Sequence, residues 1–340
     1  MEEKKAFSFG SFIVAVLNGM AQGLFSSLII GLIILQIGTY LGIDMLVSFG
    51  QIAQYMTGPA IGVGVAMSIK APSLALFSSA ASGAIGAGTI SFASGAASLT
   101  LGEPLGACIA ALFGALAGKL ISGRTKVDII LVPIATILIG GVVGVFISPA
   151  VSAMMNALGA FINSLTTLYP LFMGIMVSVV VGMVLTLPIS SAAICISLGL
   201  SGLAAGAACA GCAAQMVGFA VSSYRENRIG GLIAQGLGTS MLQIPNIWRN
   251  WRIWIPPTLA SAVTGPISTC LFKLENNASG AGMGTSGLVG QFNAVAVMGA
   301  GCIPQVILLH FILPAVLSLV FSELMRKKGW IKDGDMKLLS

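Results

Sequence analysis

The sequence is poor in charged residues, which make up only 8% of its 340 positions. The longest gap in charge lies between Asp128 and Arg225, where 96 consecutive residues carry no charged side chain. Soluble domains need a charged residue at about every fourth position, so this stretch excludes a water-soluble fold. A bilayer is crossed by a helix of about 20 residues, and the stretch therefore predicts several membrane spans.

Histidine is nearly absent, since His310 is the single one in the chain. Cys209 and Cys212 have the spacing of a zinc-binding pair, but neither a second pair of this kind nor a histidine cluster accompanies them. A structural zinc ion needs four such ligands, so we expect no metal site and no cofactor. The sequence also lacks a Walker A motif, which excludes ATP-driven transport by this chain alone, and we predict no catalytic centre.

Apolar residues and glycine are abundant, at 56% of the chain and 44 residues respectively. Glycine weakens soluble helices by about 1 kcal/mol each, whereas membrane helices use it for close backbone contact. The net charge of +6 comes from basic residues near helix ends, where the positive-inside rule explains them without a nucleic-acid partner. These features predict an all-α polytopic membrane protein in the lipid bilayer, with about ten transmembrane helices.

The apolar runs predict helices over residues 12–37, 51–69, 73–95, 104–121, 128–148, 169–187, 253–272 and within 294–322. Residues 190–222 are predicted as either one long helix or a broken one. Residues 149–168 have apolar positions at helical spacing and no charge, which predicts an amphipathic linker helix at the membrane interface. We therefore expect four parts: an N-terminal membrane half (1–148), the linker (149–168), a C-terminal transport half (169–325) and a cytoplasmic tail (326–340).

The basic residues also predict an orientation. Lys4 and Lys5 precede the first span and Arg326 begins a basic run after the last, so both termini are expected in the cytoplasm. A simple count of spans places Arg225 and Arg228 on the opposite side. Either these two residues violate the rule, or residues 190–244 contain a re-entrant element.

Residues 275–291 form a polar, glycine-rich stretch with apolar sequence on both sides. It offers a carboxylate, carboxamides, hydroxyls and backbone N–H groups, which are the groups that bind a sugar-like solute. The stretch is either a re-entrant hairpin that presents a binding site or an external loop. We expect cargo contact from Glu275, Asn276, Asn277, Thr285, Ser286, Gln291, Asn293 and His310. Further polar groups of the pathway are predicted at Gln215, Gln235, Gln243 and Asn246.

Three blocks of sequence carry a family resemblance, and they read PISSAAICISLGLSGLAAGAA (188–208), IPNIWRNWRIWIPPTLASAVTGPIST (244–269) and ENNASGAGMGTSGLVGQ (275–291). Together they resemble the EIIC-type membrane subunits of bacterial sugar phosphotransferase systems. The resemblance is strongest to the divergent branch that includes the perfringolysin-O-regulator proteins, and it covers almost the whole chain.

The resemblance implies a homodimer with re-entrant hairpins that hold the sugar in the C-terminal half. It also implies elevator-type alternating access in the bacterial inner membrane and separate IIA and IIB partners that phosphorylate the sugar. The Gly-Ile-Thr-Glu signature of better-known relatives is missing. From the resemblance as a whole we expect a transporter of a sugar or similar small polar solute. The alternatives are a membrane sensor on a transporter scaffold and an ion-coupled transporter independent of phosphorylation.

Overall fold

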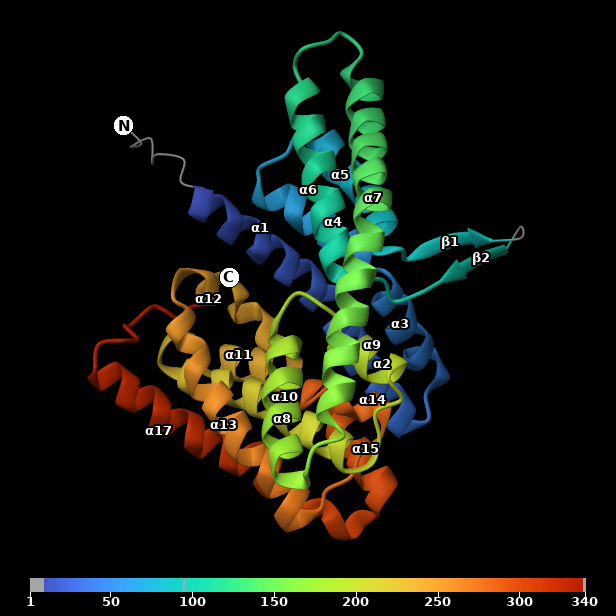
Figure 1. Cartoon of the computed structure of the whole chain (residues 1–340). Helices are drawn as coiled ribbons and strands as arrows, with labels where there is room; N and C mark the ends of the chain where they lie inside the picture. The colour runs from blue at the N-terminus through green and yellow to red at the C-terminus, as the bar shows by residue number, and fades with distance from the viewer. Residues whose placement is uncertain (1–8, 94–95, 339–340) are drawn as a thin grey trace. The chain divides into compact units, whose positions relative to one another are not determined.

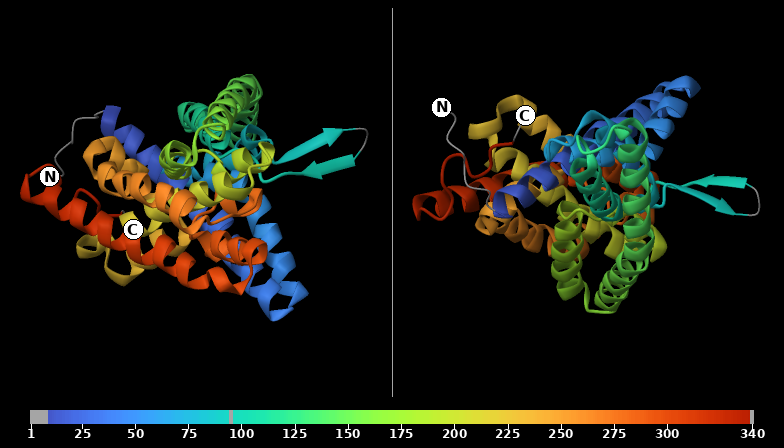
Figure 2. Two further views of the ribbon diagram at one scale, coloured as in Figure 1. Left: turned by 60° about the horizontal axis from the view of Figure 1, so that its bottom comes forward. Right: turned by 90° about the horizontal axis from the view of Figure 1, so that it is seen from above.

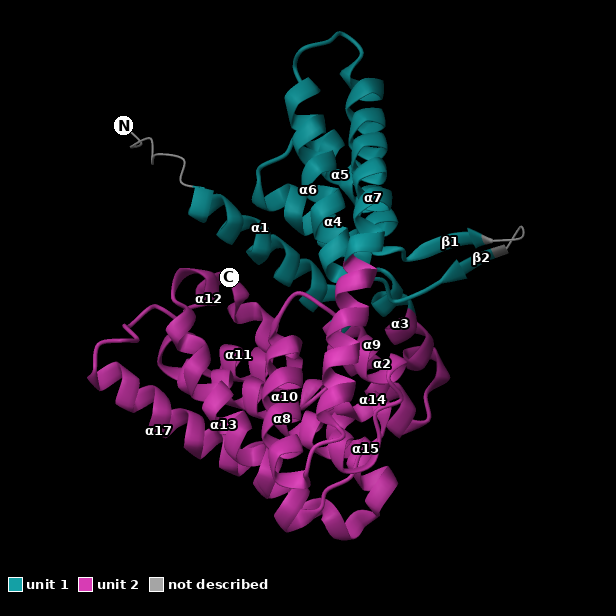
Figure 3. Ribbon diagram, in the orientation of Figure 1, with its two compact units in different colours: residues 1–28, 52–150 teal, residues 29–51, 151–340 magenta. Residues whose placement is uncertain are grey.

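The structure is a computed structural model that describes residues 9–93 and 96–338 (Figure 1). Lys4 and Lys5, on which the predicted orientation partly rests, lie outside these ranges. The described chain is almost entirely helical, as predicted, with one short antiparallel pair of strands. It divides into two compact units (Figure 3): unit 1 contains residues 1–28 and 52–150, and unit 2 contains residues 29–51 and 151–340.

Unit 1 is built on close contacts between small residues. Its elements are α1 (Phe9–Leu24), α4 (Thr57–Ser68), α5 (Ser73–Ala87), β1 (Ile90–Ala93), β2 (Ala96–Leu99), α6 (Pro104–Ile121) and the first part of α7 (Asp128–Leu165). A Cβ atom added to Gly19 would lie 2.3 Å from the carbonyl oxygen of Gly64. Contacts this short let α1 and α4 pack backbone to backbone, as glycine does in membrane helix pairs.

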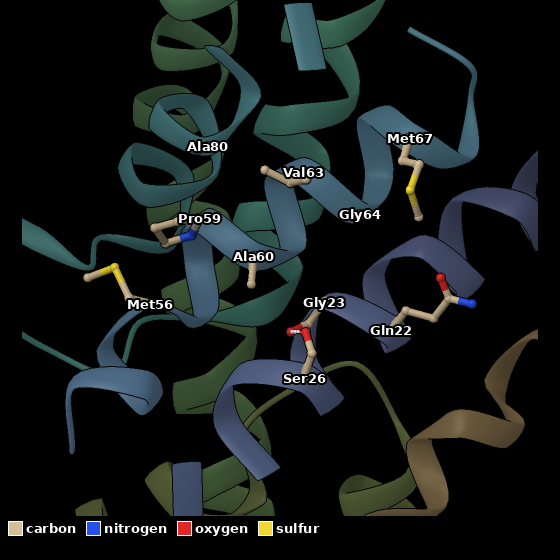
Figure 4. Close-up of a pocket in the computed structure, with 10 residues that line it drawn as sticks. All are labelled: Gln22, Gly23, Ser26, Met56, Pro59, Ala60, Val63, Gly64, Met67 and Ala80. Carbon is tan, nitrogen blue, oxygen red and sulfur yellow. Dashed lines mark hydrogen bonds between the residues drawn. The ribbon is translucent and has the colours of Figure 1, made fainter. Parts of the chain in front are cut away.

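A shallow groove follows α1 and α4 in unit 1, with a volume of about 460 Å³ (Figure 4). Met56, Val63 and Met67 line it, and Gln22 and Ser26 are its polar side chains. A small polar solute needs more hydrogen-bonding groups than this groove offers, so we place the functional site elsewhere.

Unit 2 is organised around α10 (Gly202–Ser222), which is buried along nearly its whole length. The helices α8 (Pro170–Thr186), α13 (Ile255–Pro266) and α17 (Leu313–Lys327) pack against it. The remaining helices of unit 2 are α2 (Ile30–Leu41), α3 (Asp44–Tyr55, which crosses into unit 1 after residue 51), the second part of α7, α9 (Ser191–Ser197), α11 (Tyr224–Ile233), α12 (Ile244–Arg249), α14 (Ala278–Ala281), α15 (Val289–Met298) and α16 (Ile303–Ile307). Short π and 3₁₀ turns join them: η1 (Phe25–Ile29, at the unit boundary), η2 (Ala234–Gly238), η3 (Ser240–Gln243), η4 (Trp251–Trp254), η5 (Ile267–Phe272), η6 (Ser286–Leu288), η7 (Ala300–Cys302) and η8 (Leu308–Ile312).

Five helical stretches of the described chain are long and apolar enough to cross a membrane: Phe9–Leu41, Pro104–Ile121, Asp128–Leu165, Gly202–Ser222 and Ala300–Lys327. Three shorter apolar helical stretches cover Ser73–Ala87, Pro170–Thr186 and Ser286–Met298. The chain is therefore a multi-pass helical protein, and the number of ten crossings stays a prediction.

The predicted helix over residues 73–95 is too long. α5 ends at Ala87, because Gly88 takes a left-handed conformation with φ +66° and closes the last turn. A β-hairpin follows, in which Ile90 pairs with Leu99. This hairpin projects from the helices of unit 1 (Figure 2), and Phe92 on it is 83% exposed.

The helix predicted over residues 149–168 is not a separate helix. α7 runs without a break from Asp128 to Leu165 and passes through Pro133 and Pro149. Proline removes one backbone hydrogen bond but is tolerated in membrane helices, so Pro149 does not end the helix. The amphipathic stretch is the second part of α7.

Candidate functional site

Two broken helical segments in unit 2 lie against α10. The first broken segment covers residues 224–249 and contains α11, η2, η3 and α12. The second covers residues 275–298 and contains α14, η6 and α15. Broken segments leave backbone carbonyl and N–H groups without helical partners, and within a membrane such groups must be satisfied by protein or by a ligand. Their meeting point is therefore the natural place to look for a site.

The same five-residue pattern, Gly-x-Gly-Thr-Ser, occurs once in each broken segment, at residues 236–240 and 282–286. We call these the two GxGTS segments. The hydroxyl of Thr285 donates a hydrogen bond to the carbonyl oxygen of Gly236, and the hydroxyl of Ser286 donates to the carbonyl oxygen of Gly238 at 2.8 Å. Both hydroxyl-bearing residues are buried. Two parallel bonds of one kind thus hold the segments together.

Glycine allows the second GxGTS segment to approach α10. Gly284 has φ +53°, and a Cβ atom placed on it would lie 2.7 Å from the backbone carbon of Cys212. A Cβ on Gly282 would lie 2.6 Å from the carbonyl oxygen of Ser191, whose own hydroxyl donates to the Gly282 carbonyl at 2.7 Å. Any side chain at these positions would push the segment away from α9 and α10.

A cluster of neutral polar side chains borders the first GxGTS segment. The hydroxyls of Ser240 and Thr186 lie 2.8 Å apart, and both are fully buried. The amide oxygen of Gln215, on α10, accepts from the Trp254 indole at 3.1 Å, and its amide nitrogen donates to the Thr258 hydroxyl at 3.1 Å. The cluster supplies hydrogen-bond donors and acceptors without any ionised group among these side chains, so it suits an uncharged polar ligand.

Asn276 fixes the backbone of the second broken segment. Its side-chain nitrogen donates to the Gly290 carbonyl at 2.9 Å, and its backbone pairs with Gly202 at the start of α10. Asn277 caps α14 and donates to the Asn293 amide oxygen at 2.8 Å. All three asparagines thus bond to the chain itself in this structure.

Gln291 and His310 form a buried pair, in which the Gln291 amide nitrogen lies 3.0 Å from Nδ1 of His310. His310 is 1% exposed and Gln291 is 7% exposed. The other polar atom of each, the Gln291 amide oxygen and His310 Nε2, has no hydrogen-bond partner within the described residues. The side chain of Glu275, by contrast, is at the surface.

A second polar network joins the first broken segment to the end of the chain. Gln243 donates to the Gln235 amide oxygen at 2.8 Å and to the Met336 carbonyl at 3.0 Å. Asn246 donates to the carbonyl of Lys337 at 3.0 Å. Met336 is fully buried. The residues that follow α17 are therefore packed into unit 2.

The sequence predicted Thr285 and Ser286 as site residues, and the structure brings these two together with Gly236 and Gly238. It does not bring Glu275 to them. Thr186 and Ser240 were missed, because single hydroxyl residues in apolar sequence are common. The repeated Gly-x-Gly-Thr-Ser pattern is the signal that points to Ser240, since it marks both partners of the contact.

The fold defines a polytopic α-helical membrane protein. The family model described as "Phosphotransferase system, EIIC" matches residues 14–338. The chain therefore belongs to the phosphotransferase-system EIIC family and is a multi-pass membrane protein of sugar transport. Neither the curated proteins nor the solved structures contain a match to it.

Proposed function

We propose that this chain carries a sugar or a similar small polar solute across the bacterial inner membrane, and that the cargo binds where the two GxGTS segments meet. The observation that carries this proposal is the pair of bonds from Thr285 and Ser286 to the carbonyls of Gly236 and Gly238. Each bond joins a donor and an acceptor that a cargo hydroxyl can also use. Thr186, Gln215 and Ser240 extend this set.

The mechanism that fits the family is elevator-type alternating access by a homodimer. Residues 1–148 serve as the scaffold and dimerisation half, residues 149–168 as the linker, and residues 169–325 as the moving transport half. Both termini, including the tail 326–340, face the cytoplasm. The division of the structure near residue 150 supports this assignment for residues 52–150 and 151–325, because a moving part needs its own packed core. Residues 29–51 depart from it, since they belong to the same compact unit as residues 151–340.

Phosphorylation of the cargo is assigned to separate IIA and IIB proteins. This chain binds the solute and presents its hydroxyl to the phosphocarrier.

An ion-coupled transporter is the second candidate. It is favoured by the buried Gln291–His310 pair, because the Gln291 amide oxygen and His310 Nε2 have no hydrogen-bond partner among the described residues and are free to contact a proton or the cargo. A sensor on the same scaffold is the third, and it predicts binding without flux.

Uptake by membrane vesicles separates these functions. Vesicles with the IIA and IIB proteins, and with the soluble phosphocarriers that pass the phosphoryl group from phosphoenolpyruvate to IIA, receive radiolabelled hexoses, pentoses or hexitols, with and without phosphoenolpyruvate. We expect accumulation that depends on phosphoenolpyruvate and falls at least ~10-fold in Gln215→Ala, which removes a buried amide from the cluster. Ser279→Ala is the matched control, because Ser279 is exposed on the second broken segment. Uptake driven by a pH gradient without phosphoenolpyruvate would favour ion coupling, and binding without uptake would favour a sensor.

A further inference from the structure

A pocket of about 410 Å³ lies in unit 2, beside the end of α10, the first broken segment and α17. The described residues that line it take no part in the GxGTS contact. Val221, Leu232 and Leu319 give the pocket an apolar part, and Arg225 and Glu323 give it a charged part. A ligand that fits both parts has an apolar body and a charged end.

The pocket lies where two apolar helical stretches end. Val221 stands next to the last residue of the stretch Gly202–Ser222, and Leu319 and Glu323 lie near the end of the stretch Ala300–Lys327. Helices that cross a bilayer pass from the acyl chains to the headgroups at such ends. The charged part of the pocket is therefore at the depth of the phospholipid headgroups, and its apolar part borders the acyl chains.

Arg225 and Glu323 form an ion pair, in which Nη2 of Arg225 lies 3.0 Å from a carboxylate oxygen of Glu323. The pair is open to a ligand, since the two side chains are 63% and 33% exposed. A guanidinium has several N–H groups and a carboxylate has a second oxygen, so the bond between them leaves both able to bind a further group. The pocket thus presents a cation and an anion side by side.

The two charges restrict which headgroup fits the pocket. A phosphodiester can accept from Arg225, but a headgroup with no other charge places its phosphate against the Glu323 carboxylate. A headgroup that also has a primary ammonium satisfies both residues, because the ammonium donates to the carboxylate. A choline headgroup has the same two charges, but its quaternary nitrogen carries no N–H group and cannot donate a hydrogen bond.

We propose that this pocket binds a phospholipid with an ethanolamine headgroup. The phosphate accepts from Arg225, the ammonium donates to Glu323, and an acyl chain lies along Leu319 and Val316. Leu319 and Val316 are three positions apart on α17, which places them on one face of the helix, and they are 45% and 53% exposed. This lipid site is separate from the cargo site and does not depend on the proposed transport function. Because Arg225 belongs to the first broken segment, the bound lipid bridges that segment and α17.

Native mass spectrometry of the purified protein in detergent tests the proposal. The protein is titrated with dioleoyl phosphatidylethanolamine, phosphatidylcholine and phosphatidylglycerol, which share their acyl chains and differ in the headgroup. We expect the ethanolamine lipid to bind at least ~5-fold more tightly than either of the others, which is the effect of a charge-assisted hydrogen bond. Equal affinities, or a preference for phosphatidylglycerol, would overturn the proposal.

Glu323→Gln distinguishes the pocket from other lipid contacts on the protein surface. It keeps the size of the side chain and removes the negative charge. The ethanolamine lipid should therefore lose at least ~5-fold in affinity and phosphatidylglycerol should gain affinity, which reverses their order. Arg225→Met removes the group that binds the phosphate and should weaken all three lipids. An unchanged order in Glu323→Gln, or unchanged affinities in Arg225→Met, would mean that the lipids bind elsewhere, and the proposal would fail.

Asp44→Asn is the matched control. It changes the net charge by the same amount as Glu323→Gln, and Asp44 on α3 is exposed and does not line the pocket. The order of the three lipids should stay as in the wild type. If Asp44→Asn reverses the order as well, the preference follows the net charge of the protein and the proposal is overturned. Circular dichroism of each variant verifies that it is folded before its affinities are compared.

Discussion

Replacing Gly284 by alanine tests the close approach of the second GxGTS segment to α10. The backbone of Gly284 has φ +53°, a conformation that costs an alanine about 1–2 kcal/mol. The added Cβ would also lie 2.7 Å from the backbone carbon of Cys212, and overpacking of this kind costs typically 1–3 kcal/mol. We therefore expect Gly284→Ala to destabilise the protein by about 2–5 kcal/mol.

Two other glycines separate the cost of the positive φ from the cost of overpacking. Gly199 has φ +59° and an added Cβ would meet nothing within 4 Å, so Gly199→Ala should cost the conformational part alone, about 1–2 kcal/mol. Gly301 has open space and no positive φ, so Gly301→Ala should be neutral or stabilising by about 0.4–1 kcal/mol.

The assay is equilibrium unfolding in detergent micelles, monitored by the helical signal in circular dichroism. The affinity of each variant for the tightest-binding compound among hexoses, pentoses and hexitols is measured in parallel. From most to least stable, the expected order of the variants is Gly301→Ala, then Gly199→Ala, then Gly284→Ala. Gly284→Ala should also lose ligand binding. If Gly284→Ala is as stable as Gly199→Ala, the segment does not touch α10 as described and the reasoning is refuted.

Two further predictions concern buried polar pairs. Arg326 and Glu226 form an ion pair in which both side chains are 7% exposed, so Arg326→Met should cost about 3–5 kcal/mol by leaving a buried charge. Arg225 is exposed and forms an ion pair with Glu323, so Arg225→Met should lower the free energy of unfolding by less than about 1 kcal/mol. Chemical unfolding of the two variants checks the difference, and equal losses would contradict it. His310→Leu alone leaves the amide nitrogen of Gln291 without its partner and should lower the free energy of unfolding by about 1–3 kcal/mol. His310→Leu combined with Gln291→Leu should recover most of that loss. A double variant less stable than the single one would argue against the pair.

The fold class and the positions of several apolar helices could be predicted because apolar length is a local property of the sequence. Residues 104–121 are helical as predicted, and α8 matches the helix expected over residues 169–187 within one residue at each end. The end of α5 at Ala87 could not be predicted, since glycine recurs throughout the chain and only its conformation at Gly88 stops the helix.

The site was predictable in part for a different reason. The polar composition of residues 275–291 predicted Thr285 and Ser286 as site residues. Their partners Gly236 and Gly238 lie 49 and 48 residues away and contribute only backbone oxygens. A backbone acceptor leaves no trace in the type of residue, so the partner segment could be found from sequence only through its repeated pattern.

The packed end of the chain has a consequence for the order in which the protein folds during synthesis. Asn227, Gln243 and Asn246 donate to carbonyls of Met336 and Lys337, which follow them by 109, 93 and 91 residues. Until Met336 and Lys337 have been synthesised, these three amides have no such acceptors. The first broken segment can therefore take its final shape only after residues 336 and 337 have left the ribosome, so its three amides stay without these acceptors while the intervening helices are made.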